Sequence, residues 1–215
     1  MSEELVILHN ESIVNIPEDQ HTVQVSSLVS LQASDAFTRS HPTTPCSFLL
    51  LLDSSTSMDS FFSQDQGDDR SKRDVTIEAA EALTRFFGPQ DRISIAFFGC
   101  RTVSVLQDTS GDQTRLLCDA IRQLQNYGGA TNYEAALQLA CNWARETSDQ
   151  QSRQIIFLTD GQGMNPASVI VAEVRSRDAG VRVYAFGVGT GVNRPFLERL
   201  ARDNRGIATL VQDAG

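Results

Sequence analysis

The sequence predicts an α/β fold in which a doubly wound, mostly parallel sheet of about six strands carries helices on both faces. Four apolar runs without polar alternation, at 47–53, 92–99, 154–160 and 181–188, are typical of strands buried on both faces. Segments of helical periodicity lie between most of these runs, and such alternation favours a parallel sheet. An alternating segment at 102–107 adds one antiparallel edge strand.

Length and composition limit the possible classes of protein. A chain of 215 residues with 40% hydrophobic residues suits one globular α/β domain with a short extension. The net charge of −9, from 27 acidic and 18 basic residues, argues against nucleic-acid binding and agrees with cations or basic partners. No apolar run approaches the roughly 20 residues that cross a bilayer, and Met1–Leu5 does not resemble a signal peptide, so cytoplasmic location is the default expectation.

Residues 1–45 are predicted to form an N-terminal extension, and residues 46–212 the main domain. Within the extension, 5–8 is a candidate edge strand, 22–33 alternates like a half-buried antiparallel strand, and 34–45 is a Ser-, Thr- and Pro-rich loop. The chain ends without a closing helix, and we expect it to be part of a larger protein or multi-protein system.

The elements of the main domain follow from periodicity and from turn residues. Gly88-Pro89 stops a helix, and the tight connection Cys100-Arg101 predicts an antiparallel hairpin. In order, we expect strand 47–53, polar loop 59–73, helix 74–87, strands 92–99 and 102–107, helix 112–124, turn 128–132, helix 133–146, strand 154–160, loop 161–165, helix 166–178, strand 181–188, helix 195–202 and strand 206–211.

The first buried strand ends abruptly at Asp53, and Ser55 and Ser57 follow it. Open α/β sheets place ligands at this end of their strands. A carboxylate with nearby hydroxyls suits Mg²⁺, Mn²⁺ or Ca²⁺ better than zinc. Taken alone, these residues fit equally well a polar strand-to-helix turn with Ser57 or Asp59 as the N-cap.

Two further loops carry oxygen ligands. Thr131 follows Gly128-Gly129, which allow close approach of the backbone, and Asp160 ends another buried strand. If strands 47–53 and 154–160 are neighbours, Asp53 and Asp160 converge at one edge of the sheet.

Together, Asp53-x-Ser55-x-Ser57, Thr131 in a glycine-rich loop and Asp160 in a Thr-Asp-Gly turn resemble the metal-ion-dependent adhesion site of von Willebrand factor A domains. The resemblance covers about residues 45–212. Segments 186–189 and 196–201 resemble in particular the inter-alpha-trypsin inhibitor heavy chains and bacterial relatives. The resemblance to von Willebrand factor A domains implies a Rossmann-like topology.

The resemblance also implies a function. Ser55, Ser57 and Thr131 would contact Mg²⁺ (or Mn²⁺ or Ca²⁺), while Asp53 and Asp160 would act largely through water. An open metal position would bind an Asp or Glu of a protein partner, without catalysis. The sequence departs from the family where Thr56 replaces the common glycine and where loop 59–73 is long.

Two other interpretations stay open. Asp53 and Asp160 could serve a metal-dependent hydrolase or phosphatase, although Asp-x-Asp and Gly-x-Ser-x-Gly motifs are absent and all three histidines precede residue 45. The same fold could also be a metal-free scaffold. A nucleotide-binding loop is disfavoured, because Gly187–Gly191 fits a tight turn better than a phosphate loop.

Several other residues are expected to have structural roles. Trp143 is predicted to pack in the core, and Asn132 either orients the Thr131 loop or caps the next helix. Arg70, Lys72 and Arg73 are predicted to be a solvated charge run. The remaining expectations are that Phe61 and Phe62 tuck into the body and that Cys46, Cys100, Cys118 and Cys141 are buried free thiols.

Overall fold

The computed structural model describes residues 5–9, 29–33, 45–63, 69–147, 151–163 and 181–211, and the chain divides into two compact units, 1–44 and 45–215. In the first unit, β1 (Leu5–His9) pairs with β2 (Val29–Ala33) in an antiparallel two-stranded sheet. The predicted strands at 5–8 and 22–33 therefore correspond to β1 and to the end of the second segment. The other predictions for this unit lie outside the described residues.

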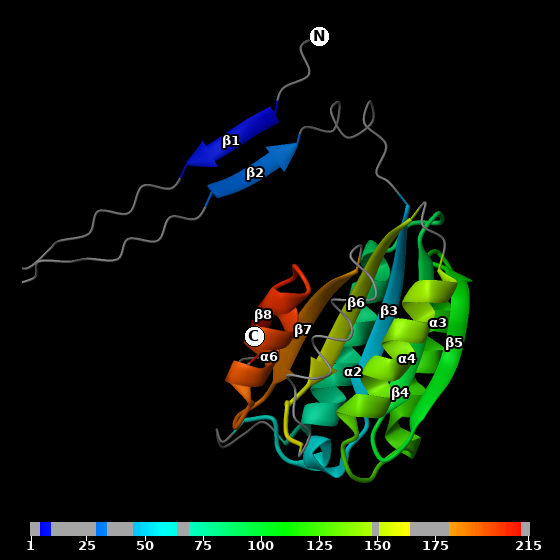
Figure 1. Cartoon of the computed structure of the whole chain (residues 1–215), viewed down its shortest axis with the longest axis vertical. Helices are drawn as coiled ribbons and strands as arrows, with labels where there is room; N and C mark the ends of the chain where they lie inside the picture. The colour runs from blue at the N-terminus through cyan, green and yellow to red at the C-terminus, as the bar shows by residue number, and fades with distance from the viewer. Residues whose placement is uncertain are drawn as a thin grey trace, which may run out of the picture. The chain divides into compact units, whose positions relative to one another are not determined.

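The second unit contains a six-stranded sheet in the order β5-β4-β3-β6-β7-β8 (Figure 1). All neighbouring strands are parallel except the edge strand β5, which runs antiparallel to β4. This arrangement confirms the predicted fold class. The strands are β3 (Cys46–Asp53), β4 (Arg92–Phe98), β5 (Thr102–Ser110), β6 (Ser152–Thr159), β7 (Arg182–Val188) and β8 (Ala208–Val211).

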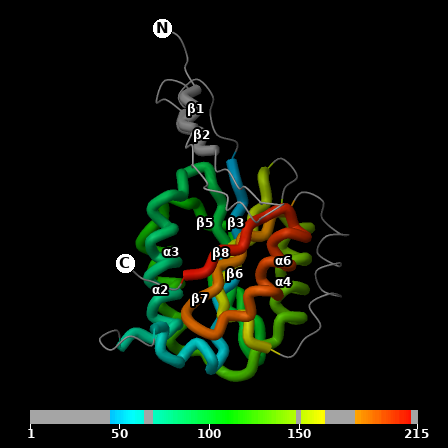
Figure 2. The backbone as a smooth tube through the Cα atoms, turned by 90° about the vertical axis from the view of Figure 1, so that its left-hand side faces the viewer, coloured from blue at the N-terminus to red at the C-terminus, as the bar shows by residue number. Residues whose placement is uncertain are grey.

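Helices cover both faces of this sheet (Figure 2). Helices α2 (Lys72–Leu83) and α3 (Thr114–Arg122) lie on one face, and α4 (Tyr133–Glu146) and α6 (Arg194–Asp203) on the other. The leucine run of β3 serves both layers, because successive side chains of a strand point to opposite faces. Leu49 and Leu51 join the core beneath α4 and α6, while Leu50 and Leu52 join the core beneath α2 and α3.

The observed helix boundaries differ from the predicted ones where local capping decides them. Helix α2 begins at Lys72 rather than residue 74, because Ser71 and Asp74 form a reciprocal capping box. It ends in a short 3₁₀ helix, Thr84–Phe86, and α3 likewise continues into the 3₁₀ helix Gln123–Asn126. The predicted helix 166–178 lies outside the described residues.

Three predictions about the burial of side chains are wrong in part. Lys72 and Arg73 are buried rather than solvated, because α2 begins early and carries both against the end of the sheet. Phe62 is buried as expected, but Phe61 is 66% exposed, since the two side chains point to opposite sides of a short bridge between Phe61 and Ser71. Of the four thiols expected to be buried, Cys141 is buried, Cys46 and Cys118 are partly buried, and Cys100 is exposed.

The structural roles of Trp143 and Asn132 agree with the prediction. Trp143 is partly buried against the core, and its indole nitrogen donates to Ser94 Oγ at 3.2 Å. The Asn132 side chain accepts from the Ala135 amide and caps α4. The segment Gly187–Gly191 ends β7 in a tight turn, with positive φ at Gly189 and Gly191.

Candidate metal centre

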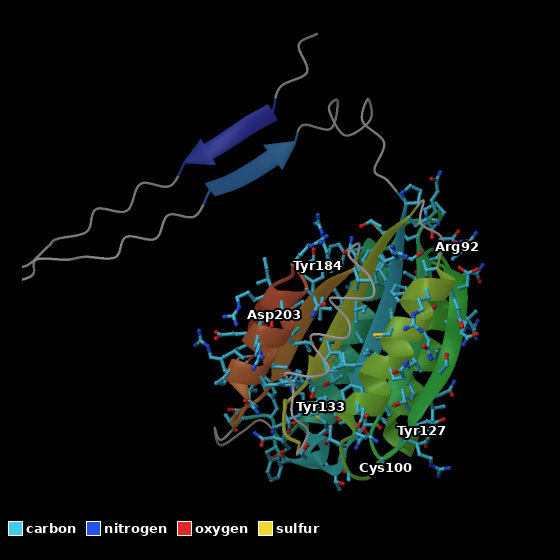
Figure 3. All side chains as sticks on the ribbon, in the orientation of Figure 1. Arg92, Cys100, Tyr127, Tyr133, Tyr184 and Asp203 are labelled. Carbon is cyan, nitrogen blue, oxygen red and sulfur yellow. The ribbon has the colours of Figure 1, made fainter. Side chains whose placement is uncertain are left out.

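The predicted site residues lie where the direction of strand connection reverses. The first strand of the large sheet, β3, is flanked by β4 on one side and β6 on the other. Asp53 ends β3, and Asp160 directly follows β6. In Figure 3 this edge is the lower end of the domain, where Cys100 and Tyr133 are labelled, opposite Arg92 at the start of β4. Ligands of open α/β sheets bind at such a switch point.

The Asp53 carboxylate is fully buried, and the protein holds both of its oxygens. Oδ1 accepts a hydrogen bond from the Ser55 amide at 2.8 Å, and Oδ2 accepts one from the Thr159 hydroxyl at 2.5 Å. Burial raises the pKa of Asp53 to about 6, although these hydrogen bonds favour the charged form. The side chain is thus oriented in advance, and it gains from any cation that compensates its charge.

The loop after Asp53 curls so that two hydroxyls meet. Residues Thr56–Asp59 form a 3₁₀ turn, and Ser55 Oγ lies 3.0 Å from Ser57 Oγ. Two ligands at adjacent corners of an Mg²⁺ octahedron, each about 2.1 Å from the ion, are roughly 3 Å apart. The two serines therefore stand at the separation that one octahedral edge requires.

The loop that carries Thr131 is fastened to the serine loop. Both the amide and the hydroxyl of Thr56 donate to the Gly129 carbonyl at 2.9 Å. Thr56, the residue that departs from the family pattern, thus connects the two loops through its side chain. Gly129 has φ of +113°, and a Cβ there would lie 2.9 Å from Cys100 Sγ, so the close approach depends on glycine.

Asp160 is also fully buried, with a protein partner on each oxygen. Its Oδ1 accepts from the Gln162 amide at 2.9 Å, and its Oδ2 accepts from Lys72 Nζ at 3.1 Å. The loop that follows Asp160 also approaches the Thr131 loop, because a Cβ on Gly163 would lie 3.5 Å from the Thr131 Cβ. All three predicted segments therefore meet at one edge of the sheet.

Two residues that orient Asp53 were not identified from the sequence. Thr159 is buried, donates to Asp53 and accepts from the Gly161 amide at 3.0 Å. The Tyr133 hydroxyl lies 3.0 Å from Thr159 Oγ1, and burial raises the pKa of Tyr133, which keeps the phenol protonated. Thr159 was visible only as the first residue of the Thr-Asp-Gly turn.

Two basic residues at the start of α2, which the sequence led us to expect on the surface, contact the candidate centre. Lys72 bonds Asp160, and Arg73 braces the serine loop from behind, donating to the carbonyls of Ser54 and Ser55 at 3.2 and 3.3 Å. The Arg73 guanidinium also bonds Asp59 Oδ1 at 2.7 Å. Asp59 therefore anchors the loop through Arg73.

The donor set fits a hard divalent cation. Among the described residues, no group of three or more His, Cys, Asp or Glu side chains is placed to hold a metal ion. A cation at the Asp53 edge would thus depend on hydroxyl oxygens and on water held by carboxylates, as Mg²⁺ tolerates.

A cavity of about 870 Å³ lies elsewhere, beside α4 and the β4–β5 hairpin. Ser94, Gln138 and Trp143 are among its lining residues, and none of the five predicted site residues lines it. The cavity is therefore separate from the candidate metal centre. No helix in the described part of the chain has the length and hydropathy of a membrane span.

Comparison with known proteins places this arrangement in a family. The mouse (Mus musculus) protein inter alpha-trypsin inhibitor, heavy chain 4, is 30% identical over 152 residues, which cover 64% of this chain but only 16% of that protein. Two solved structures, each 18% identical, share the fold. A von Willebrand factor type A protein from Catenulispora acidiphila gives a TM-score of 0.65 over 86% of this chain and 41% of that one. Manganese-loaded Plasmodium vivax TRAP protein gives 0.60 over 79% and 69%.

At these identities the solved structures establish the fold alone. The family model for the von Willebrand factor type A domain matches residues 48–162, from within β3 to the loop that follows Asp160. This match spans more than half of the chain and includes all three segments of the candidate centre. The chain belongs to the von Willebrand factor type A domain family.

Proposed function

We propose that this domain binds Mg²⁺ at the Asp53 edge and uses the ion to bind an acidic residue of a protein partner. Domains of this family are generally adhesion or protein-interaction modules and are typically not enzymes. The finer assignment, that Ser55, Ser57 and Thr131 contact the ion while Asp53 and Asp160 hold its waters, is our proposal.

One observation carries the proposal: the 3.0 Å separation of the Ser55 and Ser57 hydroxyls beside two fully buried carboxylates. Burying a carboxylate costs free energy unless it is paired. Asp160 is paired with Lys72, and a divalent ion would supply the charge that Asp53 lacks. The manganese in the Plasmodium vivax TRAP structure supports divalent binding by this fold, and Mn²⁺ is therefore a suitable probe here.

The proposed partner chemistry follows from the ligands. Three hydroxyls are neutral, so they leave the charge of a bound divalent ion incompletely offset. A divalent ion so held offers an open coordination position to an anionic oxygen. An Asp or Glu side chain of a partner supplies that oxygen in compact form. Phe61, exposed on the short bridge that follows the serine loop, offers an apolar contact in the same segment.

Calorimetric titration with Mg²⁺ and Mn²⁺ tests the metal site. We expect wild-type protein to bind one ion and the Ser55→Ala/Ser57→Ala double variant to lose binding. Ser104→Ala is the matched control, because Ser104 is an exposed serine of the edge strand β5. Unchanged binding by the double variant would refute the assigned ligands.

The carboxylate step is tested with a blocked aspartate (N-acetyl-aspartate N-methylamide) as the probe. It should bind in the presence of Mn²⁺, displace coordinated water detected by proton relaxation, and be released by chelator. Binding that survives the chelator would contradict the metal bridge.

A further inference from the structure

Lys72 is an unusual residue in this chain. It is the single lysine among 18 lysine and arginine residues, and it is 5% exposed. The chain uses arginine at every other basic position, so the one compact ammonium stands beside the candidate metal centre.

The surroundings of Lys72 hold its side chain in place. The residue opens α2 directly after the Ser71 cap, and its amide donates to the Ser60 carbonyl at 3.0 Å. Its stem packs on Gly189, where an added Cβ would lie 2.9 Å from Lys72 Cγ and 3.0 Å from Cε. The absence of a side chain at Gly189 therefore leaves the space that the Lys72 stem occupies on its way to Asp160.

The ion pair that results is fully internal. Lys72 Nζ donates to Asp160 Oδ2 at 3.1 Å, and the two side chains are 7% and 0% exposed. An ammonium is a compact point charge that can serve one carboxylate oxygen, whereas the planar guanidinium of arginine spans two. Oδ1 of Asp160 is already taken by the Gln162 amide, which fits a single-point donor.

This pair changes the charge that a metal ion would meet. Asp53 and Asp160 contribute two negative charges, and Lys72 returns one positive charge. Arg73 adds none to the count, because it is paired with Asp59 at 2.7 Å. The buried site thus carries one net negative charge, so one divalent ion overshoots neutrality by one unit, and a partner carboxylate then restores it.

We propose that Lys72 is a positioning residue that weakens the metal held alone and couples it to the partner carboxylate. The proposal rests on the proposed metal function and deepens it. Because Asp53, Asp160 and Lys72 are buried, their charges act on a nearby ion more strongly than exposed charges would, so the neutral combination of cation and carboxylate is favoured over the cation alone. The domain would take up its ion together with its acidic partner.

The first test measures Mn²⁺ affinity from the free-ion signal in electron paramagnetic resonance. Lys72→Met should tighten Mn²⁺ binding by on the order of tenfold or more, since it removes a unit charge near the ion. The control Arg85→Met changes net charge equally at an exposed position and should leave affinity within about twofold, since exposed charges are screened. Equal affinity of wild type and Lys72→Met overturns this inference alone. Absence of Mn²⁺ binding in both overturns the proposed function and this inference with it.

The second test uses blocked aspartate as the carboxylate probe. In wild type, saturating probe should tighten Mn²⁺ binding at least about fivefold, and in Lys72→Met this coupling should shrink, because the loaded site is already neutral without the probe. Coupling of equal size in both proteins overturns the inference.

A third measurement needs no substitution at Lys72. Selective ¹⁵N-lysine labelling gives one side-chain ammonium resonance, because the chain has one lysine. Mg²⁺ should shift this resonance in wild type but not in Asp53→Ala. An unmoved resonance in wild-type protein that calorimetry shows to be loaded with Mg²⁺ overturns the inference while leaving the metal site intact.

Discussion

Thr159→Val tests how far a metal centre of this kind depends on a residue that does not touch the ion. Thr159 lies at the end of β6 with no exposed surface. Its hydroxyl donates to Asp53 Oδ2 at 2.5 Å and accepts from the Gly161 amide at 3.0 Å. Valine keeps the shape and removes these two hydrogen bonds together with the 3.0 Å contact between the Thr159 and Tyr133 hydroxyls, so Asp53 loses a donor that favours its charged form.

The structure sets the size of the expected effect. A hydrogen bond to a charged group contributes about 1.5–3 kcal/mol. If ionised Asp53 is needed for metal binding, Thr159→Val should weaken Mn²⁺ binding by roughly 10- to 150-fold. The Gly161 amide also becomes an unsatisfied buried donor, which costs about 1–3 kcal/mol of folding free energy.

Calorimetry with Mn²⁺ and urea denaturation in chelator measure the two effects separately. Thr84→Val is the matched control, because Thr84 is equally buried and its hydroxyl donates to the Glu81 carbonyl, away from the candidate centre. It should lower stability without changing metal affinity. Wild-type Mn²⁺ affinity in a folded Thr159→Val protein would refute the argument that Asp53 must be oriented in advance.

Three further predictions concern stability in the absence of metal. Gly189→Ala should lower the free energy of unfolding by about 2 kcal/mol or more, because the new Cβ adds strain at φ +82° and contacts Lys72. In the control Gly191→Ala, at φ +76°, the new Cβ meets no atom within 4 Å, so this variant should lose only about 1 kcal/mol. Equal losses for the two variants in thermal denaturation would contradict the contact with Lys72. Arg73→Met should lower the free energy of unfolding, measured by urea denaturation, by about 2–4 kcal/mol, because a buried cation bonded to three carbonyls is lost. A loss below about 1 kcal/mol, as expected for an exposed ion pair, would show that Arg73 does not stabilise the serine loop. The pKa of Asp53 is about 6 in the folded protein and near 4 when unfolded, so between these values the folded state binds more protons than the unfolded state. The free energy of unfolding in chelator should therefore fall by up to about 3 kcal/mol as pH rises from 4 to 6. Asp53→Asn should lose this pH dependence, and an identical pH dependence in the variant would disprove the assignment to Asp53.

Much of the fold and the outline of the centre could be predicted because they depend on patterns with a single physical meaning. Five apolar residues in a row have to be buried on both faces, and Leu49 to Leu52 divide between the two layers accordingly. A carboxylate at the end of each of two such strands converges once the strands are neighbours, as β3 and β6 are. The separations within the centre, such as the distance between the serine hydroxyls, required the structure.

The side chains that were misplaced show what local pattern does not contain. Phe61 and Phe62 are chemically identical neighbours, and only the bridge between Phe61 and Ser71 decides which one is buried. Thr159 looked like part of a motif, but its hydrogen bond to Asp53 depends on the parallel pairing of β3 and β6. In each case a contact between distant segments decides the outcome.

Lys72 is the clearest case in which contacts between distant segments decide whether a side chain is buried. It stands in a polar, charged stretch, where a lysine is ordinarily solvated because burying an unpaired ammonium costs several kcal/mol. Its burial needs two distant residues at once: Asp160 to pair the charge and Gly189 to leave space for the stem. Neither requirement is visible from the neighbouring sequence, yet together they set the net charge of the centre. If Lys72 acts as proposed, the ligand motif indicates which oxygens would surround a cation, while a residue outside the motif would set the cation's affinity and its coupling to a partner.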